Sequence, residues 1–348
     1  MGEDWGSSVR GPEIAVVIPT HQRRELVLRV LASLAAQHLD VSRFEVSLVC
    51  DGCTDGTASR AMETYGPTLA RGLNLVVTIQ PCSGAAAARN AGVTSTTAPL
   101  LLFLDDDMVA APDLLQRHLR AHRTSPGGIV YGAVPVHEGS PRSFLSAGLA
   151  AWARRRDRQL RQQASVSPDE VLGGHLSVSR TVFDLLGGFD PLFTAGGRFG
   201  GEDIDFGWRA RLQGIPLRYV PQAVARQVYT KTFRALARDI RESALADVNL
   251  VRRHPELRPY LMLGRLHELG PFQRRFFEAT MRGSKVASLL GKVGTLALDA
   301  AGRWNRTGAV FDTLHGLMRA HLYAVGLTQA GGIPAPASAR DLAEAKTA

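Results

Sequence analysis

Leu100 to Asp107 is Leu-Leu-Leu-Phe-Leu-Asp-Asp-Asp, an apolar run that ends on three consecutive carboxylates. Continuous aliphatic residues are typical of a parallel strand buried on both faces, and ligands in open α/β sheets bind beyond the carboxyl ends of such strands. Three adjacent acids repel one another, so a cation such as Mg²⁺ or Mn²⁺ between Asp105 and Asp107 would stabilise them. The alternative is that the acids end the strand and cap a helix that begins near Pro112-Asp113.

The chain has 348 residues, 45% of them hydrophobic, which is enough for one large domain with an appendage or for two domains. No apolar run approaches the roughly 18 to 20 residues that cross a bilayer. Residues 1–12 are polar and unlike a signal peptide. We therefore expect a cytoplasmic protein.

The three cysteines, Cys50, Cys53 and Cys82, lack the second pair that a zinc site needs, so reduced structural thiols are favoured.

The formal net charge of +9, with a pI near 10.0, favours anionic partners: nucleotide phosphates, an acidic membrane face or nucleic acid. The excess is concentrated in residues 142–161 and 226–258. Arginine-rich solvated helices would give the same composition without any binding function, and the charge alone does not separate the two interpretations.

Strands and helices alternate along the first hundred residues. This alternation predicts a parallel, doubly wound sheet in which the four turns after the strands face one cleft. Aliphatic runs predict strands at residues 14–19, 45–50, 74–79 and from 100, and helical spacing predicts helices at 25–37, from about 57 and from about 84.

The rest of the chain becomes increasingly helical. Further strands are expected at 129–136 and 172–179, with an arginine-rich helix and a loop over the cleft between them. Residues 232–326 show helical periodicity interrupted by prolines. Within them, 286–300 and 310–327 are amphipathic enough to lie on a surface, although such helices more often face a core. The predicted organisation is a flexible segment 1–11, a catalytic domain 12–230, a helical region 231–330 and a disordered tail 331–348.

Four motifs lie at the ends of the four predicted strands. An aspartate at such an edge can accept hydrogen bonds from a base or a ribose, and an arginine can pair with phosphate. For Asp51-Gly52 the simpler interpretation is a tight turn. The motifs are Pro19-Thr20-His21, residues 51–57 (Asp-Gly-Cys-Thr-Asp-Gly-Thr), Ala88-Arg89-Asn90 within 84–92, and the triple aspartate.

Together these motifs resemble the inverting, nucleotide-sugar-dependent glycosyltransferases of family two. The resemblance implies the glycosyltransferase-A fold: a Rossmann-like α/β architecture with a mixed, mainly parallel sheet, flanking helices and here a helical C-terminal extension. Six motifs in order are far more specific than a single Asp-x-Asp. The resemblance covers residues 12 to about 255 and continues in Gly187-Gly188-Phe189-Asp190, in 200–205 (Gly-Gly-Glu-Asp-Ile-Asp) and in Arg209.

The resemblance also implies roles for individual residues. Asp203 would be the general base, and Asp107, with Asp105, would hold a divalent metal, Mg²⁺ or Mn²⁺, that bridges the diphosphate. Displacement at an anomeric carbon needs a carboxylate to take the acceptor proton and a cation to stabilise the leaving diphosphate, and the two acidic clusters match these needs. Glu202 and His175 would contact the acceptor, and the donor side would comprise Pro19, Thr20, Arg23, Asp51, Arg89, Asp105 and Asp106.

The chain departs from the family pattern at several positions. Cys50 and Cys53 stand where Asp and Ser are common, and His175 stands where Asn is frequent. Many relatives carry a metal-binding His near the strand at Val220, but residues 225–229 contain none, so phosphate oxygens could complete the metal site. Without a Gln-x-x-Arg-Trp motif or a transmembrane segment, a processive polysaccharide synthase is not expected.

The leading hypothesis is a metal-dependent inverting glycosyltransferase that moves one sugar from a nucleoside diphosphate to a hydroxyl or another nucleophile. The acceptor would be a small molecule, a lipid or a glycan, and peripheral membrane contact is left open. One alternative is a nucleotidyltransferase that makes activated sugars, but residues 19–24 lack the glycine of its triphosphate loop. The other is a basic protein that binds nucleic acid or an anionic surface; the chain has no motif for nucleic acid, which is not an expected partner. The sugar, the base and the oligomeric state are not predicted.

Overall fold

The computed structural model describes residues 11–69, 72–163, 166–167, 170–302 and 309–334. The predicted flexible N-terminus, apart from Gly11, and the predicted tail beyond residue 334 lie outside these ranges. The chain divides into two compact units. The first comprises Met1–Ser140, Leu149–Arg198 and Glu202–Tyr229, and the second comprises Pro141–Gly148, Phe199–Gly201 and Thr230–Ala348.

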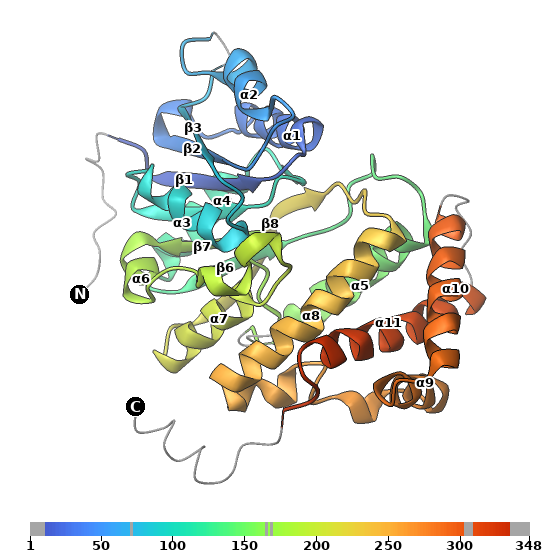
Figure 1. Cartoon of the computed structure of the whole chain (residues 1–348). Coiled ribbons are helices and arrows are strands. Elements are labelled where there is room, and N and C mark those ends of the chain that lie inside the picture. Colours follow the sequence, from blue (N-terminus) through green and yellow to red (C-terminus); the bar gives the residue numbers. More distant parts are fainter. Residues whose placement is uncertain (1–10, 70–71, 164–165, 168–169, 303–308, 335–348) are drawn as a thin grey trace. The chain divides into compact units, whose positions relative to one another are not determined.

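The first unit contains a mixed sheet whose strand order is β3-β2-β1-β4-β7-β6-β8-β5 (Figure 1). Strands β1 to β4 are mutually parallel, as the alternation of strands and helices predicts. Beyond β4 the sheet becomes mixed, because β7 runs antiparallel to both β4 and β6. The described strands are β1 Ile14–Thr20, β2 Phe44–Asp51, β3 Leu75–Gln80, β4 Leu100–Leu104, β5 Met108–Ala110, β6 Ile129–Ala133, β7 His175–Ser179 and β8 Leu217–Gln227.

The predicted strands are all present, but some are shorter than the apolar runs indicate. Strand β4 ends at Leu104, before the acids, and β7 begins at His175 rather than at Leu172 because Gly173 and Gly174 lie in a loop. The three-residue β5, which pairs with β8, was not predicted, since so short a segment carries no periodicity. The helices of this unit are α1 Arg24–Ala35, α2 Thr57–Tyr65, α3 Ala85–Thr94, α4 Leu114–Thr124, α5 Phe144–Leu160, α6 Arg180–Leu185 and α7 Glu202–Leu212. The first residues of α5 belong to the second unit.

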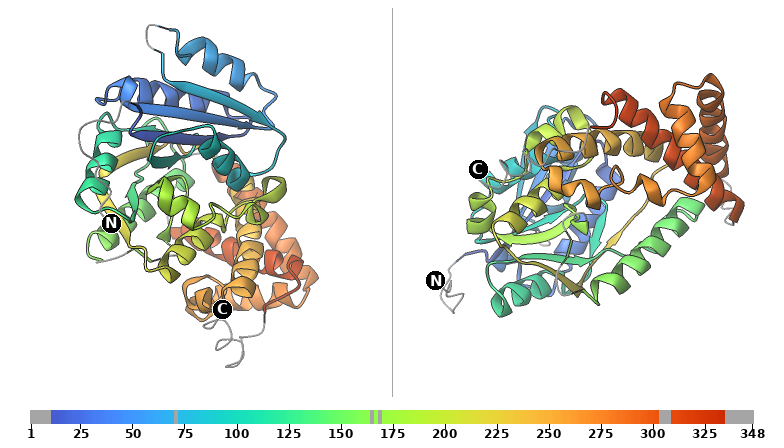
Figure 2. Two further views of the ribbon diagram at one scale, coloured as in Figure 1. Left: turned by 90° about the vertical axis from the view of Figure 1, so that its left-hand side faces the viewer. Right: turned by 90° about the horizontal axis from the view of Figure 1, so that it is seen from below.

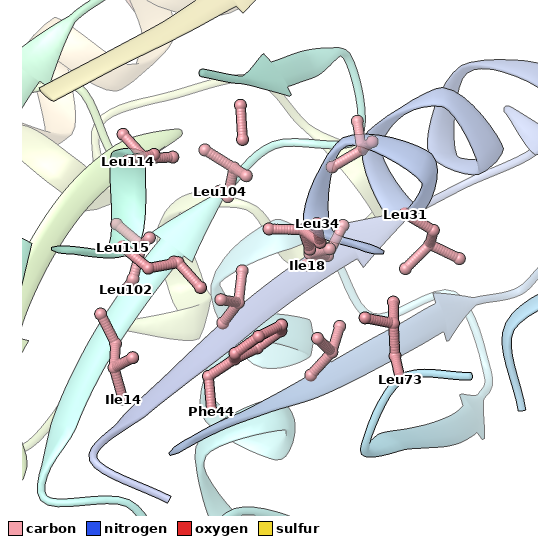
Figure 3. Close-up of a cluster of buried hydrophobic side chains, with 14 of the residues drawn as sticks. Ile14, Ile18, Leu31, Leu34, Phe44, Leu73, Leu102, Leu104, Leu114 and Leu115 are labelled. Atoms are coloured by element: carbon pink, nitrogen blue, oxygen red, sulfur yellow. The ribbon is translucent and has the colours of Figure 1, made fainter. Parts of the chain in front are cut away.

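Strands β1, β2 and β4 are buried on both faces of the sheet, which explains their nearly continuous apolar residues. Successive residues point to opposite sides. Ile14 and Ile18 of β1 pack toward α1 and α4, where Leu31 and Leu115 lie (Figure 3). Val17 of β1 belongs to the cluster on the other face, together with side chains of α3, α6 and α7. Two views of the ribbon show these helices around the sheet (Figure 2).

The second unit is helical, as predicted for residues 232–326. Pro255 and Pro259 lie in a 3-10 helix, Pro255–Tyr260, and Pro271 opens α9, so the prolines separate the long helices. None of the described helices is long and apolar enough to cross a membrane. The long helices are α8 Phe233–Arg253, α9 Pro271–Met281, α10 Lys285–Gly302 and α11 Ala309–Gln329 (Figure 1).

Candidate active site

The carboxyl ends of β1, β2 and β4 lie at one edge of the parallel part of the sheet. The β1–β2 register pairs Thr20 with Cys50, and the β2–β3 register pairs Asp51 with Gln80, so these residues mark the edge directly. Asp105 follows the last residue of β4. The order of the strands thus brings together three motifs that are far apart in sequence, and the ligand edge of an α/β sheet is where they meet.

Of the three aspartates, Asp106 is the best compensated. Its carboxylate accepts a hydrogen bond from Thr20 Oγ1 at 2.8 Å and pairs with Arg23 Nη1 at 2.9 Å. Burial raises the pKa of Asp106, while Arg23 and Thr20 favour its ionised form. Asp106, Thr20 and Arg23 therefore form a partly buried network that joins β1 and the residues after it to the turn after β4. Their predicted contact with the donor stays a prediction.

Asp107 is buried and much less compensated. Arg23 Nη1 lies 3.6 Å from its carboxylate, and the amide nitrogen assigned to Gln227 lies 3.2 Å from it. Burial and the neighbouring Asp106 and Asp105 raise the pKa of Asp107 to about 7. A buried carboxylate with this surplus of negative charge has the electrostatic environment that a cation would stabilise.

Arg89 of α3 joins the two acidic clusters. Its Nη2 donates to Asp105 at 2.8 Å and its Nη1 donates to Glu202 at 2.7 Å. Burial alone would lower the pKa of Arg89, but the two carboxylates outweigh burial and raise it. Arg89 is 4% exposed, so in this conformation its guanidinium holds carboxylates rather than reaching outward. Its predicted contact with a nucleotide stays a prediction.

Two consecutive glycines make a second connection between the clusters. The backbone N–H of Gly173 donates to Asp203 at 3.1 Å, and the carbonyl of Gly174 accepts from the N–H of Asp105 at 3.0 Å. A Cβ at Gly174 would lie 2.2 Å from Asp105 Oδ2, so only glycine allows this approach. The loop before β7 therefore sets the position of Asp203 relative to Asp105.

Asp203 lies in the first turn of α7, next to Glu202. Burial, followed by the charge of Glu202, raises the pKa of Asp203 to about 7. A carboxyl group that titrates near neutral pH can alternate between accepting and releasing a proton. Within the described residues, Glu202 Oε2 is buried without a hydrogen-bond partner, so it has a free acceptor beside Asp203.

The carboxylate of Asp51 accepts hydrogen bonds from other groups of the protein. Its carboxylate accepts hydrogen bonds from Gln80 Nε2 at 2.8 Å and from the N–H groups of Ser83 at 2.7 Å and Gly84 at 2.8 Å. These contacts tie the end of β2 to the start of α3. Pro19 is buried within β1. These contacts give Asp51 a structural role, and recognition of the nucleoside by Asp51 stays a prediction.

His175 is 1% exposed and lies among other histidines. Its Nε2 is 3.0 Å from Nε2 of His118, whose Nδ1 is 2.8 Å from Ser177 Oγ. Burial lowers the pKa of His175 to about 3, so the ring is neutral. In this conformation His175 is a packed core residue, and direct contact with an acceptor would require access that the surrounding side chains do not give.

The structure shows contacts for three residues to which the sequence assigned no role. Gln227, the last residue of β8, contacts Asp107. The family resemblance predicts a histidine ligand near this position, and that expectation is the signal that could have identified Gln227. Asn90 donates from Nδ2 to the carbonyl of Phe189 and accepts from its N–H, which anchors the Gly-Gly-Phe-Asp motif to α3. Arg209 donates to the carbonyls of Leu186 and Gly188, so its place in the motif pattern is structural.

Among the described residues no group of three or more His, Cys, Asp and Glu is arranged to hold a metal ion by itself. A cation at Asp107 would therefore need ligands from a bound substrate or from water. A cavity of about 570 Å³ lies elsewhere in the first unit, lined by Arg117, Arg120 and Arg218 among others, and none of the predicted site residues lines it.

Replacing Arg89 should destabilise the fold, because it leaves two carboxylates without their shared partner. We expect Arg89→Met to lower the free energy of unfolding by about 3 to 5 kcal/mol, the usual cost of breaking a buried charge network. Urea denaturation measures this. Arg60→Met, which removes an exposed pair with Glu63, is the matched control and should cost less than about 1 kcal/mol. Equal losses in the two variants would contradict the bridging role of Arg89.

The comparison with sequence families gives one consistent result. The family model described as "Glycosyltransferase like family 2" matches residues 12–242. A validoxylamine A glucosyltransferase from Streptomyces hygroscopicus is 32% identical over 285 residues, which cover 74% of this chain and 64% of that protein. The succinoglycan biosynthesis protein ExoM of Rhizobium meliloti is 29% identical over 220 residues, covering 60% of this chain and 65% of that protein. The chain thus spans somewhat less than two thirds of the length of these relatives.

Solved structures show the same fold. A mannosyltransferase from Pyrobaculum calidifontis, in complex with GDP-Man and Mn²⁺, aligns with a TM-score of 0.59 and 21% identity over 91% of this chain and 87% of that one. S. aureus TarS residues 1–349 in complex with UDP-GlcNAc align with a TM-score of 0.53 and 16% identity over 92% of both chains. The strand order and these matches confirm the glycosyltransferase-A fold. The chain belongs to glycosyltransferase family 2.

Proposed function

We propose that this glycosyltransferase transfers a single sugar, with inversion, from a nucleoside-diphosphate sugar to an acceptor nucleophile, with the help of a divalent cation. The observation that carries the proposal is the Arg89 bridge. One guanidinium contacts Asp105 on the side of the triple aspartate and Glu202 next to Asp203, so the two acidic clusters lie within the reach of one side chain. Such proximity is what a direct displacement needs, because a leaving group and a base must act on the same sugar carbon from opposite sides.

The carboxylates after β4 fit a hard cation. Asp107 has the surplus of negative charge described above, and the side chain of Asp105 is 37% exposed although one of its oxygens pairs with Arg89. The side-chain amide of Gln227 could rotate to present its oxygen, since the assignment of its O and N follows from the hydrogen-bond network. Asp107, Asp105 and Gln227 would hold the ion. When bound, the ion would stabilise the negative charge of the leaving diphosphate.

On the acceptor side, Asp203 is the proposed general base. Its carboxylate is held by the N–H groups of Gly173 and Ile204, which fix its direction without neutralising it. The raised pKa leaves a substantial fraction protonated at neutral pH and makes the ionised form a stronger base than an ordinary carboxylate. The free Oε2 of Glu202 supplies a hydrogen-bond acceptor for a second hydroxyl of the acceptor.

The relatives indicate where a search for the substrates should begin. One relative is named a validoxylamine A glucosyltransferase, and the two structural neighbours were solved with GDP-Man and with UDP-GlcNAc. We propose a hexose donor and a polyhydroxylated small molecule as acceptor, with glycan and lipid acceptors as the other classes to test. A screen of UDP- and GDP-sugars for metal-dependent release of the nucleoside diphosphate tests the donor. Absence of release with every donor and acceptor class would contradict the proposal.

Removing the Asp107 carboxylate should abolish metal-dependent donor binding. We expect Asp107→Asn to reduce the transfer rate by roughly a thousandfold or more, because the lost ligand supplies several kcal/mol of leaving-group stabilisation. Calorimetry with nucleoside diphosphate and Mn²⁺ measures the binding. Asp113→Asn, which removes a partly exposed carboxylate paired with Arg117 at the start of α4, is the control and should bind normally. Unchanged affinity in the Asp107 variant would remove Asp107 from the site.

Replacing Asp203 should separate chemistry from binding. Asp203→Asn keeps the shape of the side chain but cannot take a proton, so transfer should fall by at least about a hundredfold. Donor affinity should change by less than about threefold, since Asp203 lies on the acceptor side. Asp184→Asn, an exposed carboxylate on α6, is the control. Near-normal transfer by the Asp203 variant, or a loss matched by a lower melting temperature, would favour a structural role at the start of α7.

The raised pKa of Asp203 predicts the pH dependence. The ionised form is the active one, so kcat/KM should rise with pH up to about 7 and fall about tenfold per unit below it. The measurement should use saturating Mn²⁺, because the metal would displace the proton of Asp107 and leave Asp203 as the titrating group. The residual activity of Asp203→Asn should lack this limb. A profile that is flat through neutrality would assign the base to another residue.

A further inference from the structure

Helix α10 packs against its neighbour through small residues. Its buried positions include Gly291 and Gly294. A Cβ at Gly291 would lie 2.0 Å from His321 Nε2, and one at Gly294 would lie 2.4 Å from Met318 Sδ, both on α11. Because larger side chains do not fit there, this face of α10 is fixed toward α11. The buried face consists of Ala287, Gly291, Gly294, Leu298 and Ala301.

The large aliphatic residues of α10 lie on a different face and are exposed. Each of five side chains is between 54% and 71% exposed, although single exposed leucines would need no explanation. Their spacing of three or four residues places them along one stripe of the helix. An ordinary amphipathic helix directs such a stripe at the core, and here it faces outward. This aliphatic stripe consists of Val286, Leu289, Leu290, Val293 and Leu296.

Positive charge borders the aliphatic stripe. Lys285 and Lys292 are exposed, and their separation of seven residues puts both on one edge of the stripe. Neither lysine makes an ion pair with any residue that the structure describes. The sequence has no acidic residue between 285 and 298, and the single acid of α10, Asp299, accepts a hydrogen bond from the N–H of Arg234. The stripe therefore combines exposed apolar area with uncompensated positive charge.

We propose that the aliphatic stripe of α10 docks on the surface of an anionic lipid bilayer. An interfacial helix buries its apolar side chains at the boundary between headgroups and acyl chains, and flanking lysines attract anionic headgroups. The net charge of +9 acts in the same direction. This corresponds to the surface-lying interpretation of residues 286–300, in place of the core-facing one.

A second copy of the chain fits the stripe less well. In a two-fold contact the same patch meets itself, so two patches of the same positive charge are brought together and repel each other. A bilayer with anionic lipids instead offers the opposite charge over the whole length of the helix. The proposal does not depend on the donor chemistry, because no residue of the stripe belongs to the candidate active site.

Sedimentation of the full chain with vesicles tests the proposal. The wild type should bind vesicles of phosphatidylcholine mixed with phosphatidylglycerol, and binding should be much weaker with phosphatidylcholine alone. Leu289→Ser combined with Val293→Ser should reduce the partition coefficient at least about tenfold. Lys285→Gln combined with Lys292→Gln should reduce it about fivefold per lysine, and added salt should remove that difference.

Leu185→Ser combined with Leu212→Ser is the matched control, because it removes two equally exposed leucines from the first unit. It should bind vesicles like the wild type. Melting temperatures of the three variants should match that of the wild type, since the replaced side chains are exposed. No vesicle binding by the wild type, or an equal loss in the control, overturns the proposal. Concentration-dependent dimers that the Leu289/Val293 variant abolishes would overturn it in favour of a second copy.

Discussion

The candidate active site depends on the pairing of the Arg89 guanidinium with two carboxylates. The guanidinium is almost fully buried and holds Asp105, after β4, and Glu202, at the start of α7, with one nitrogen each. Two carboxylates on separate elements would otherwise repel each other in a poorly solvated interior, so the cation between them fixes their separation. Lysine could not replace it, because a single ammonium lacks the planar fork that reaches both partners. The Gly173-Gly174 loop adds a second connection through the backbone, because it contacts both Asp203 and Asp105.

The negative charges of the aspartates near Arg89 are not equally balanced by positive or donor groups, and this difference has chemical consequences. Asp106 is paired with Arg23 and Thr20, whereas Asp107 has one distant arginine and an amide. The surplus of negative charge at Asp107 is what the proposed cation would neutralise. On the acceptor side, burial and Glu202 bring the pKa of Asp203 to about 7. One half of the site thus has the negative charge that the proposed metal needs, and the other half has the raised pKa that the proposed base needs.

In the C-terminal helix α10, small residues form the packed face and large aliphatic residues form the exposed face. In α10 the glycines allow close packing on α11, and the aliphatic side chains remain outside with lysines on their border. An apolar stripe in that position costs free energy in water unless something covers it. An anionic bilayer would cover the aliphatic side chains and pair with the lysines at the same time, which a core contact or a symmetric dimer would not.

The sequence by itself determined the parallel part of the sheet and the edge where its chemistry lies, because buried aliphatic strands and the turns after them are local patterns. It identified the acids at 105–107 and 202–203, since carboxylates directly after a strand or at a helix start are visible in one dimension. Only the tertiary structure decided their partners: Arg89 between the clusters, Gln227 from β8 beside Asp107, and His175 in the core rather than at a surface. Contacts across more than a hundred residues, and the burial that shifts a pKa, depend on how elements pack. The outward direction of the α10 stripe was likewise decided by packing, because periodicity shows that a helix has an apolar face but not what that face meets.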